Sequence, residues 1–172
     1  MSAIKNSVVT LRVYGDDLIP EDITRMLGVL PTYGVTKGQE KISKKTGKSM
    51  INRQTGKPIV AKSGMWQYSA SDREPEDIDG QIKEIFSKVS ADITVWQSIT
   101  KKYQTNLFCG LFMSEENDGL SISPQSLAIL AERGIELWFA IYAPSRNISP
   151  IDPCPCNSGK TFAECCAPKA NA

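Results

Sequence analysis

Four of the five cysteines lie close together near the end of the 172-residue chain. Their spacing is Cys-x-Cys, eight residues, then Cys-Cys, and they are Cys154, Cys156, Cys165 and Cys166. Thiolates are soft ligands that hold Zn²⁺ in a tetrahedron, and a closed set of four thiolates forms a structural rather than a catalytic site. The spacing therefore predicts one structural zinc ion per chain, with all four cysteines as ligands.

The residues around these cysteines are too polar to fold by burying apolar side chains. Beyond Pro150 there are few large apolar residues besides Ile151 and Phe162, so a metal ion or disulfides must supply the free energy of ordering. A bond between the adjacent cysteines would close a strained ring, and two bonds between the pairs would require an oxidising compartment. We therefore favour zinc, with disulfides, an iron–sulfur cluster and a free-thiol redox site as the alternatives.

This C-terminal segment resembles the SEC-C motif, a short zinc-binding module of the secretion motor ATPase and of many other bacterial proteins. The matching residues are Cys154, Pro155, Cys156, Ser158, Gly159, Lys160, Phe162, Cys165 and Cys166. The resemblance implies a metal-ligand role for all four cysteines. The family module docks an export chaperone or anionic lipid through its lysines. Here Asn157, Thr161 and Ala163 depart from the pattern, Glu164 adds an acid and only Lys160 remains of the lysines, so the resemblance does not imply that docking role.

The remaining residue types do not form a catalytic motif. The chain has no histidine, which excludes Ser–His and Cys–His catalysis and every metal site that contains histidine. Two Gly-Lys-Ser/Thr sequences lack the first glycine of a phosphate-binding loop. Acids near the ends of predicted strands are interpreted as turn and helix N-terminal residues; they are Asp16, Asp17, Glu115, Glu116 and Asp118. We therefore predict no catalytic residue and expect a protein that is not an enzyme.

Positive charge is concentrated in residues 34–64, which contain eight lysines and arginines but one acid, although the whole chain has a net charge of only +1. The predicted contact residues for an anionic partner are Lys44, Lys45, Lys48, Arg53 and Lys57. Nucleic acid, an acidic protein and the acidic remainder of the chain all fit this charge. The interpretation that we favour for the segment is nevertheless a solvated, mobile loop rich in Gly, Ser and Lys. Few aromatic residues lie among the lysines, so the segment lacks the stacking residues of a single-strand binding surface.

The body of the chain alternates between strand and helix patterns. Apolar alternation predicts strands over 7–14, 64–69, 105–113 and 135–142, with Cys109 as a small buried apolar residue. Helical periodicity predicts helices from Pro20 to the glycines of 28–34, over 77–90, over 93–103, and from Pro124 to Gly134. On this last helix we expect an inward face formed by Leu127, Leu130 and Ala131. A hairpin with its turn at 55–58 is expected inside the basic segment. The tryptophans, Trp66, Trp96 and Trp138, are interpreted as core or sheet-face residues.

These elements predict an α+β fold with one mainly antiparallel or mixed sheet and helices packed on it. Two halves of the chain repeat the order strand, helix, strand, which suggests an internal duplication. We expect a domain at 1–148 with the basic insertion 34–64, followed by a zinc knuckle at 149–172. Residues 7–143 resemble a bacterial family of domains of unknown function, number 4279, through residues 11–15, 19–28, 37–38, 64–69, 120–123 and 137–142. That resemblance implies no particular activity.

The expected function is that of a non-enzymatic cytoplasmic binding or adaptor protein with a structural zinc motif. The sequence has no apolar run long enough to span a membrane and no apolar signal segment at its start, so no membrane partner is expected. The alternatives are a nucleic-acid-binding protein that uses residues 34–64, and an immunity or accessory factor of a bacterial conflict system. The protein partner and the oligomeric state stay open.

Overall fold

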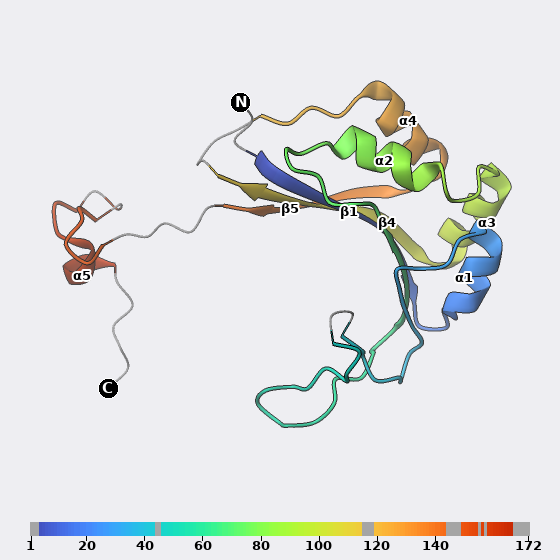
Figure 1. Cartoon of the computed structure of the whole chain (residues 1–172), viewed down its shortest axis with the longest axis horizontal. Coiled ribbons are helices and arrows are strands. Elements are labelled where there is room, and N and C mark those ends of the chain that lie inside the picture. The colour runs from blue at the N-terminus through green and yellow to red at the C-terminus, as the bar shows by residue number, and fades with distance from the viewer. Residues whose placement is uncertain are drawn as a thin grey trace.

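Five strands form one mixed sheet in the order β2-β3-β1-β4-β5 (Figure 1). The computed structural model describes residues 4–43, 46–114, 119–143, 149–154, 156 and 158–166. The strands are β1 (Ile4–Gly15), β2 (Tyr33–Val35), β3 (Gly64–Ser69), β4 (Gln104–Met113) and β5 (Glu136–Tyr142). The central strand β1 pairs antiparallel with both β3 and β4, and β2 pairs antiparallel with β3. β5 is parallel to β4, which makes the sheet mixed.

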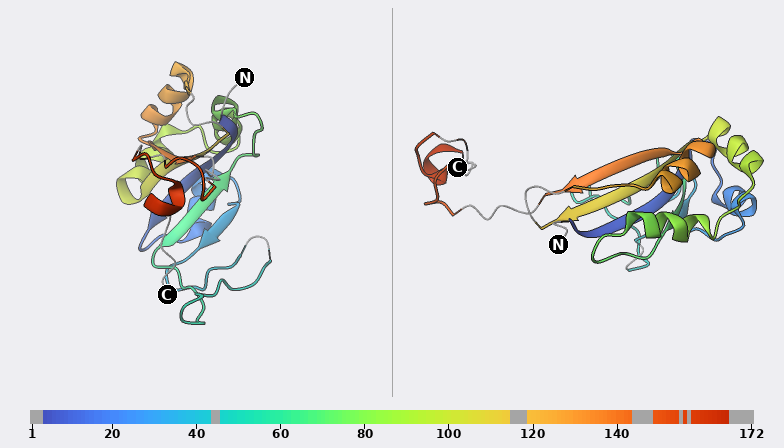
Figure 2. Two further views of the ribbon diagram at one scale, coloured as in Figure 1. Left: turned by 90° about the vertical axis from the view of Figure 1, so that its left-hand side faces the viewer. Right: turned by 90° about the horizontal axis from the view of Figure 1, so that it is seen from above.

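Four helices cover one face of this sheet, as the two further views show (Figure 2). They are α1 (Pro20–Leu27), α2 (Ile78–Phe86), α3 (Ile93–Lys102) and α4 (Pro124–Glu132), and the short α5 (Phe162–Cys165) belongs to the C-terminal segment. Side chains just before three of these helices accept hydrogen bonds from backbone N–H groups of the first turn: Asp77 before α2, Asp92 before α3 and Ser123 before α4. The helices thus begin and end close to where the sequence predicts.

The core lies between the helices and the covered face of the sheet. Val9, Leu11 and Val13 alternate along β1 and have no solvent exposure, and Leu107 on β4 is buried beside them. The intervening residues of the same strands point to the opposite face, which no described helix covers. The central strands β1 and β4 therefore each have one face in the core and one face that no described helix covers, as their period-two pattern requires.

A buried polar network attaches α2 to the central strand. The Ser7 hydroxyl donates to the Gln81 side-chain oxygen at 2.6 Å, and the Gln81 amide donates to the backbone oxygens of Ser7 and Ser71 at 3.1 and 2.8 Å. Both Ser7 and Gln81 have no exposed surface. Because their polar atoms are paired, burial of these two side chains does not carry the cost of an unsatisfied donor or acceptor.

Two details differ from the sequence-based expectations. On α4 only Leu130 is buried among the three residues expected to face inward, whereas Leu127 is 46% exposed and Ala131 is also exposed. The reason is that α4 packs on the edge strand β5 and beside α2, so one row of its side chains reaches the core. The two strand–helix–strand units also pair differently: β4 and β5 are neighbours, whereas β3 separates β1 from β2.

The basic segment forms an arm in which three short stretches of chain are joined by isolated antiparallel bridges between residues 40 and 60, 42 and 49, and 51 and 58. The predicted hairpin is present, but its turn begins earlier than the expected 55–58, because the N–H of Asn52 donates to the Lys57 carbonyl at 2.9 Å and Pro58 is bridged to Ile51. Within the described ranges, no helix is both long enough and apolar enough to cross a membrane.

Candidate metal centre

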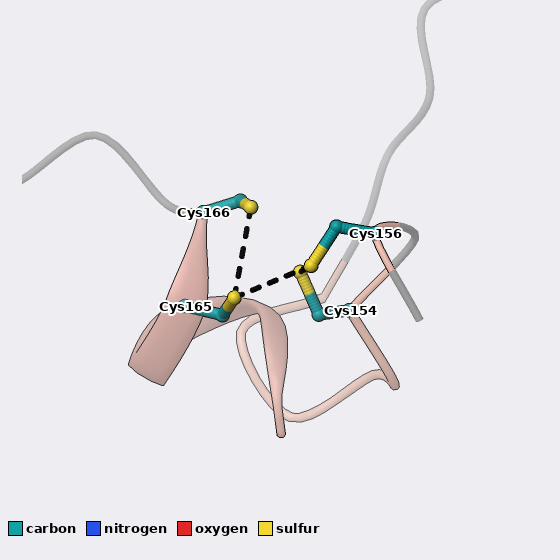
Figure 3. A group of neighbouring side chains, drawn as sticks. All are labelled: Cys154, Cys156, Cys165 and Cys166. Atoms are coloured by element: carbon teal, nitrogen blue, oxygen red, sulfur yellow. Dashed lines mark hydrogen bonds between the residues drawn. The ribbon is translucent and has the colours of Figure 1, made fainter. Parts of the chain in front are cut away.

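The four cysteines of the C-terminal segment converge on one point (Figure 3). All four Sγ atoms lie within 4.8 Å of one another. The separations of consecutive sulfurs are 3.2 Å from Cys154 to Cys156, 3.3 Å from Cys156 to Cys165 and 3.7 Å from Cys165 to Cys166. A tetrahedral Zn²⁺ ion with Zn–S bonds of about 2.3 Å needs sulfurs about 3.8 Å apart. The cluster thus has the ligand type, the number of ligands and nearly the spacing of a closed zinc site.

Backbone hydrogen bonds bring the two cysteine pairs together. The N–H of Cys154 donates to the Lys160 carbonyl at 2.8 Å, and the N–H of Phe162 donates to the Asp152 carbonyl at 2.8 Å. These bonds close a tight loop at Gly159, whose φ of +73° lies in the left-handed region that favours glycine. The chain then enters α5, which carries the second cysteine pair at its end.

The acid that distinguishes this segment from the SEC-C pattern has a structural role. The Glu164 carboxylate accepts hydrogen bonds from the backbone N–H of Thr161 at 3.2 Å and from its hydroxyl at 2.8 Å. These bonds cap the start of α5 and lower the pKa of Glu164. The spacing Thr-x-x-Glu is a local signal of a capping box, so this role could have been predicted from the sequence.

The crowded sulfurs influence one another electrostatically. Hydrogen bonds from Ser158 and then from Cys154 and Cys165 lower the pKa of Cys156 to about 6. The neighbouring sulfurs, first Cys154, raise the pKa of Cys166 to about 12. One thiolate is therefore stabilised, and the formation of further thiolates beside it is opposed. A divalent cation among the sulfurs would remove this repulsion.

The other predicted contact residues are only partly described. Lys48, Arg53 and Lys57 lie exposed on the arm, whereas Lys44 and Lys45 lie outside the described residues. The arm is tied together by backbone bonds from Lys41 to Ile59 at 2.8 Å and from Ile59 to Met50 at 2.7 Å. The structure thus places the three described cations on a protruding element.

Of the acids near strand ends, Asp16 and Asp17 lie in the described ranges, and each pairs with a lysine. Asp16 pairs with Lys37 at 2.7 Å and Asp17 pairs with Lys102 at 2.8 Å. Glu115, Glu116 and Asp118 lie outside the described residues.

Cys109 is completely buried in β4, and burial raises the pKa of its thiol to about 12, as expected for a core residue.

One group of residues on the uncovered face of the sheet was not predicted from the sequence. Arg12, Asn106 and Trp138 come from β1, β4 and β5 and line a common pocket. The strand alternation of residues 7–14 puts Arg12 on the face opposite to the core side chains. Its neighbours depend on the strand order and register, for which the sequence contains no local signal.

Comparison with known families assigns both parts of the chain. The family model described as Domain of unknown function (DUF4279) matches residues 3–144, and the model of the SEC-C motif matches residues 152–168. No curated protein and no solved structure matches the chain. The chain therefore belongs to the DUF4279 family of domains of unknown function, and it carries a SEC-C motif after that domain.

Proposed function

We propose that this chain is a non-enzymatic binding protein whose C-terminal segment folds around one structural zinc ion. The observation that carries the metal proposal is the convergence of four sulfurs, all within 4.8 Å of one another, from two cysteine pairs separated in sequence. Soft thiolates select zinc over Mg²⁺ or Ca²⁺, and four protein ligands leave no coordination position for a reacting water. Zinc ligation requires these cysteines to stay reduced, as they do in the cytoplasm, so we propose a cytoplasmic protein.

Metal analysis of the intact protein tests this proposal. We expect elemental analysis of the full chain, purified under reducing conditions, to find about one zinc ion per chain, since one Cys₄ set holds one ion. Cys165→Ser should bind much less zinc, whereas Cys109→Ser, a control outside the cluster, should retain it. A folded protein without zinc, a protein with iron in its place, or one with its four C-terminal cysteines in disulfides would contradict the proposal.

The binding role of the body is supported by the edge strand β5. Phe139 is 38% exposed and Ile141 is 65% exposed on this strand, beside Leu120 at 37%. These side chains line an apolar hollow of about 200 Å³. Exposed apolar side chains on an unpaired sheet edge are typical of surfaces that contact another protein. A protein partner therefore fits this part of the chain.

Nucleic-acid binding by the basic arm is the second candidate. It is favoured by Lys48, Arg53 and Lys57, which are exposed and have no acid within 4.0 Å among the described residues. Phosphate contacts release counterions, so the affinity for DNA or RNA should fall steeply as salt rises. The triple variant K48E/R53E/K57E should abolish binding in a fluorescence-polarisation titration.

The matched control for this variant is K83E/K88E/K101E, which reverses three exposed lysines on or beside α2 and α3. It changes the net charge equally but leaves the arm intact, so it should bind nearly as well as the unmodified protein. Equal losses in the two variants, or no binding at low salt by the unmodified protein, would exclude the arm as a nucleic-acid site.

A further inference from the structure

The uncovered face of the sheet holds an arginine at its centre. Arg12 on β1 lies opposite Gln67 of β3 and Asn106 of β4 in the strand register. On the same face, Phe108 of β4 lies opposite Trp138 of the parallel edge strand β5. A cation thus lies among aromatic side chains on the side of the sheet that faces away from the helices.

The side chain of Arg12 is held in one position. Its guanidinium carbon lies 4.5 Å from the ring centroid of Phe108 and 5.0 Å from that of Trp138. Its Nε donates to the Asn106 side-chain oxygen at 2.8 Å, and the Asn106 amide in turn donates to the Tyr14 hydroxyl at 3.0 Å. Two rings and one amide therefore fix the plane of the guanidinium.

The charge of Arg12 is not neutralised by the described residues. Within the ranges that the structure describes, its hydrogen bonds use Nε alone, and no carboxylate lies within 4.0 Å of it. Burial lowers the pKa of Arg12, because the sheet removes part of its water. The two Nη groups have no partner within the described ranges, so both are available to a planar anion that can accept two parallel hydrogen bonds.

A pocket of about 360 Å³ lies beside this guanidinium. It is lined by Arg12, Tyr14, Met65, Asn106, Glu136 and Trp138. This volume is within the range of small-molecule sites, about 300–1,000 Å³. Trp138 is 48% exposed and offers an aromatic surface, and Met65 offers a second apolar surface. The acid Glu136 in the lining disfavours a ligand with several negative charges.

We propose that this pocket binds a small, singly charged carboxylate attached to a flat ring. The carboxylate pairs with the two Nη groups of Arg12, and the ring lies against Trp138 and Met65. The planar guanidinium of Arg12 matches the geometry of a carboxylate, which accepts two parallel hydrogen bonds from it. The proposal concerns the body of the chain and does not depend on the zinc site or on the basic arm.

The test uses the full chain and three probes that share a 2-substituted naphthalene ring: 2-naphthoate, its uncharged amide 2-naphthamide, and 2-naphthyl phosphate. Binding is followed by NMR titration of the Trp138 indole N–H and the Arg12 Nε–H. We expect saturable binding of naphthoate at least about tenfold tighter than that of the amide, the ratio expected for one charge-assisted contact. The phosphate should bind more weakly than naphthoate because of Glu136.

Variants locate the interaction. Arg12→Gln should weaken naphthoate binding at least about tenfold, whereas Arg25→Gln, which removes an exposed arginine of α1, should leave it unchanged. Glu136→Gln should strengthen binding of the phosphate. If Arg12→Gln does not fold, the comparison of naphthoate with its amide in the unmodified protein still tests whether the pocket selects a carboxylate. Equal binding of acid and amide, equal or tighter binding of the phosphate, or no shift at Trp138 would overturn the proposal.

Discussion

Replacement of Cys154 by serine is expected to release the zinc ion and to unfold residues 149–166 while leaving the sheet folded. Three thiolates cannot close the tetrahedron, and Cys154 is the most buried of the four cysteines, with 4% exposure. Structural zinc contributes an apparent free energy of about 10–16 kcal/mol in small peptides, which exceeds what the few apolar residues of this segment can supply. Hydrogen exchange measured by mass spectrometry should show lost protection in peptides from this segment and unchanged protection in β1 and β4.

Cys109→Ser provides the opposite result as a control. It places a hydroxyl in the apolar core, so it should destabilise the body by about 1–3 kcal/mol and leave zinc binding unaffected. Removal of zinc from the unmodified protein with a chelator should reproduce the exchange pattern of Cys154→Ser. Persistent protection of 149–166 in the metal-free protein would show that the segment folds without the ion.

Replacement of Trp66 by alanine is expected to lower the free energy of unfolding by about 3–5 kcal/mol. Trp66 on β3 has no exposed surface, and its indole N–H donates to the Thr24 hydroxyl of α1 at 3.1 Å. The substitution therefore leaves a cavity between the sheet and α1 and removes a hydrogen bond between them. Urea denaturation followed by circular dichroism measures the loss.

Trp138→Ala is the matched control, because it removes the same side chain from the same sheet. Trp138 lies on the uncovered face and is 48% exposed, so its removal should cost about 1 kcal/mol or less. If both substitutions reduced stability equally, the assignment of the two sheet faces would be wrong.

The sequence alone was sufficient for most of the helices and strands. The alternation of Val9, Leu11 and Val13 predicted the central strand, and Pro124 after Ser123 predicted the start of α4. These signals are local, because strand periodicity and helix capping depend on residues a few positions apart. The mixed α+β architecture followed from their order, and the structure confirms it.

The cysteine cluster was predictable for a similar reason. The two pairs are separated by eight residues, so a single turn of the chain brings them together, and the ligand chemistry of thiolates limits which ions they can hold. The role of Glu164 as a helix cap could also have been predicted from the sequence, since its partner Thr161 lies only three residues earlier.

Tertiary structure alone decided the parallel pairing of β4 with β5, the exposure of Leu127 on α4, and the meeting of Arg12 with Asn106 and Trp138. Arg12 and Trp138 are 126 positions apart in sequence, and they become neighbours only through the order and register of three strands. A one-residue shift of register would turn each of these side chains to the other face. Long-range pairing depends on the free energy of the whole sheet and its helices, whereas the strand patterns and the cysteine spacing depend on nearby residues alone.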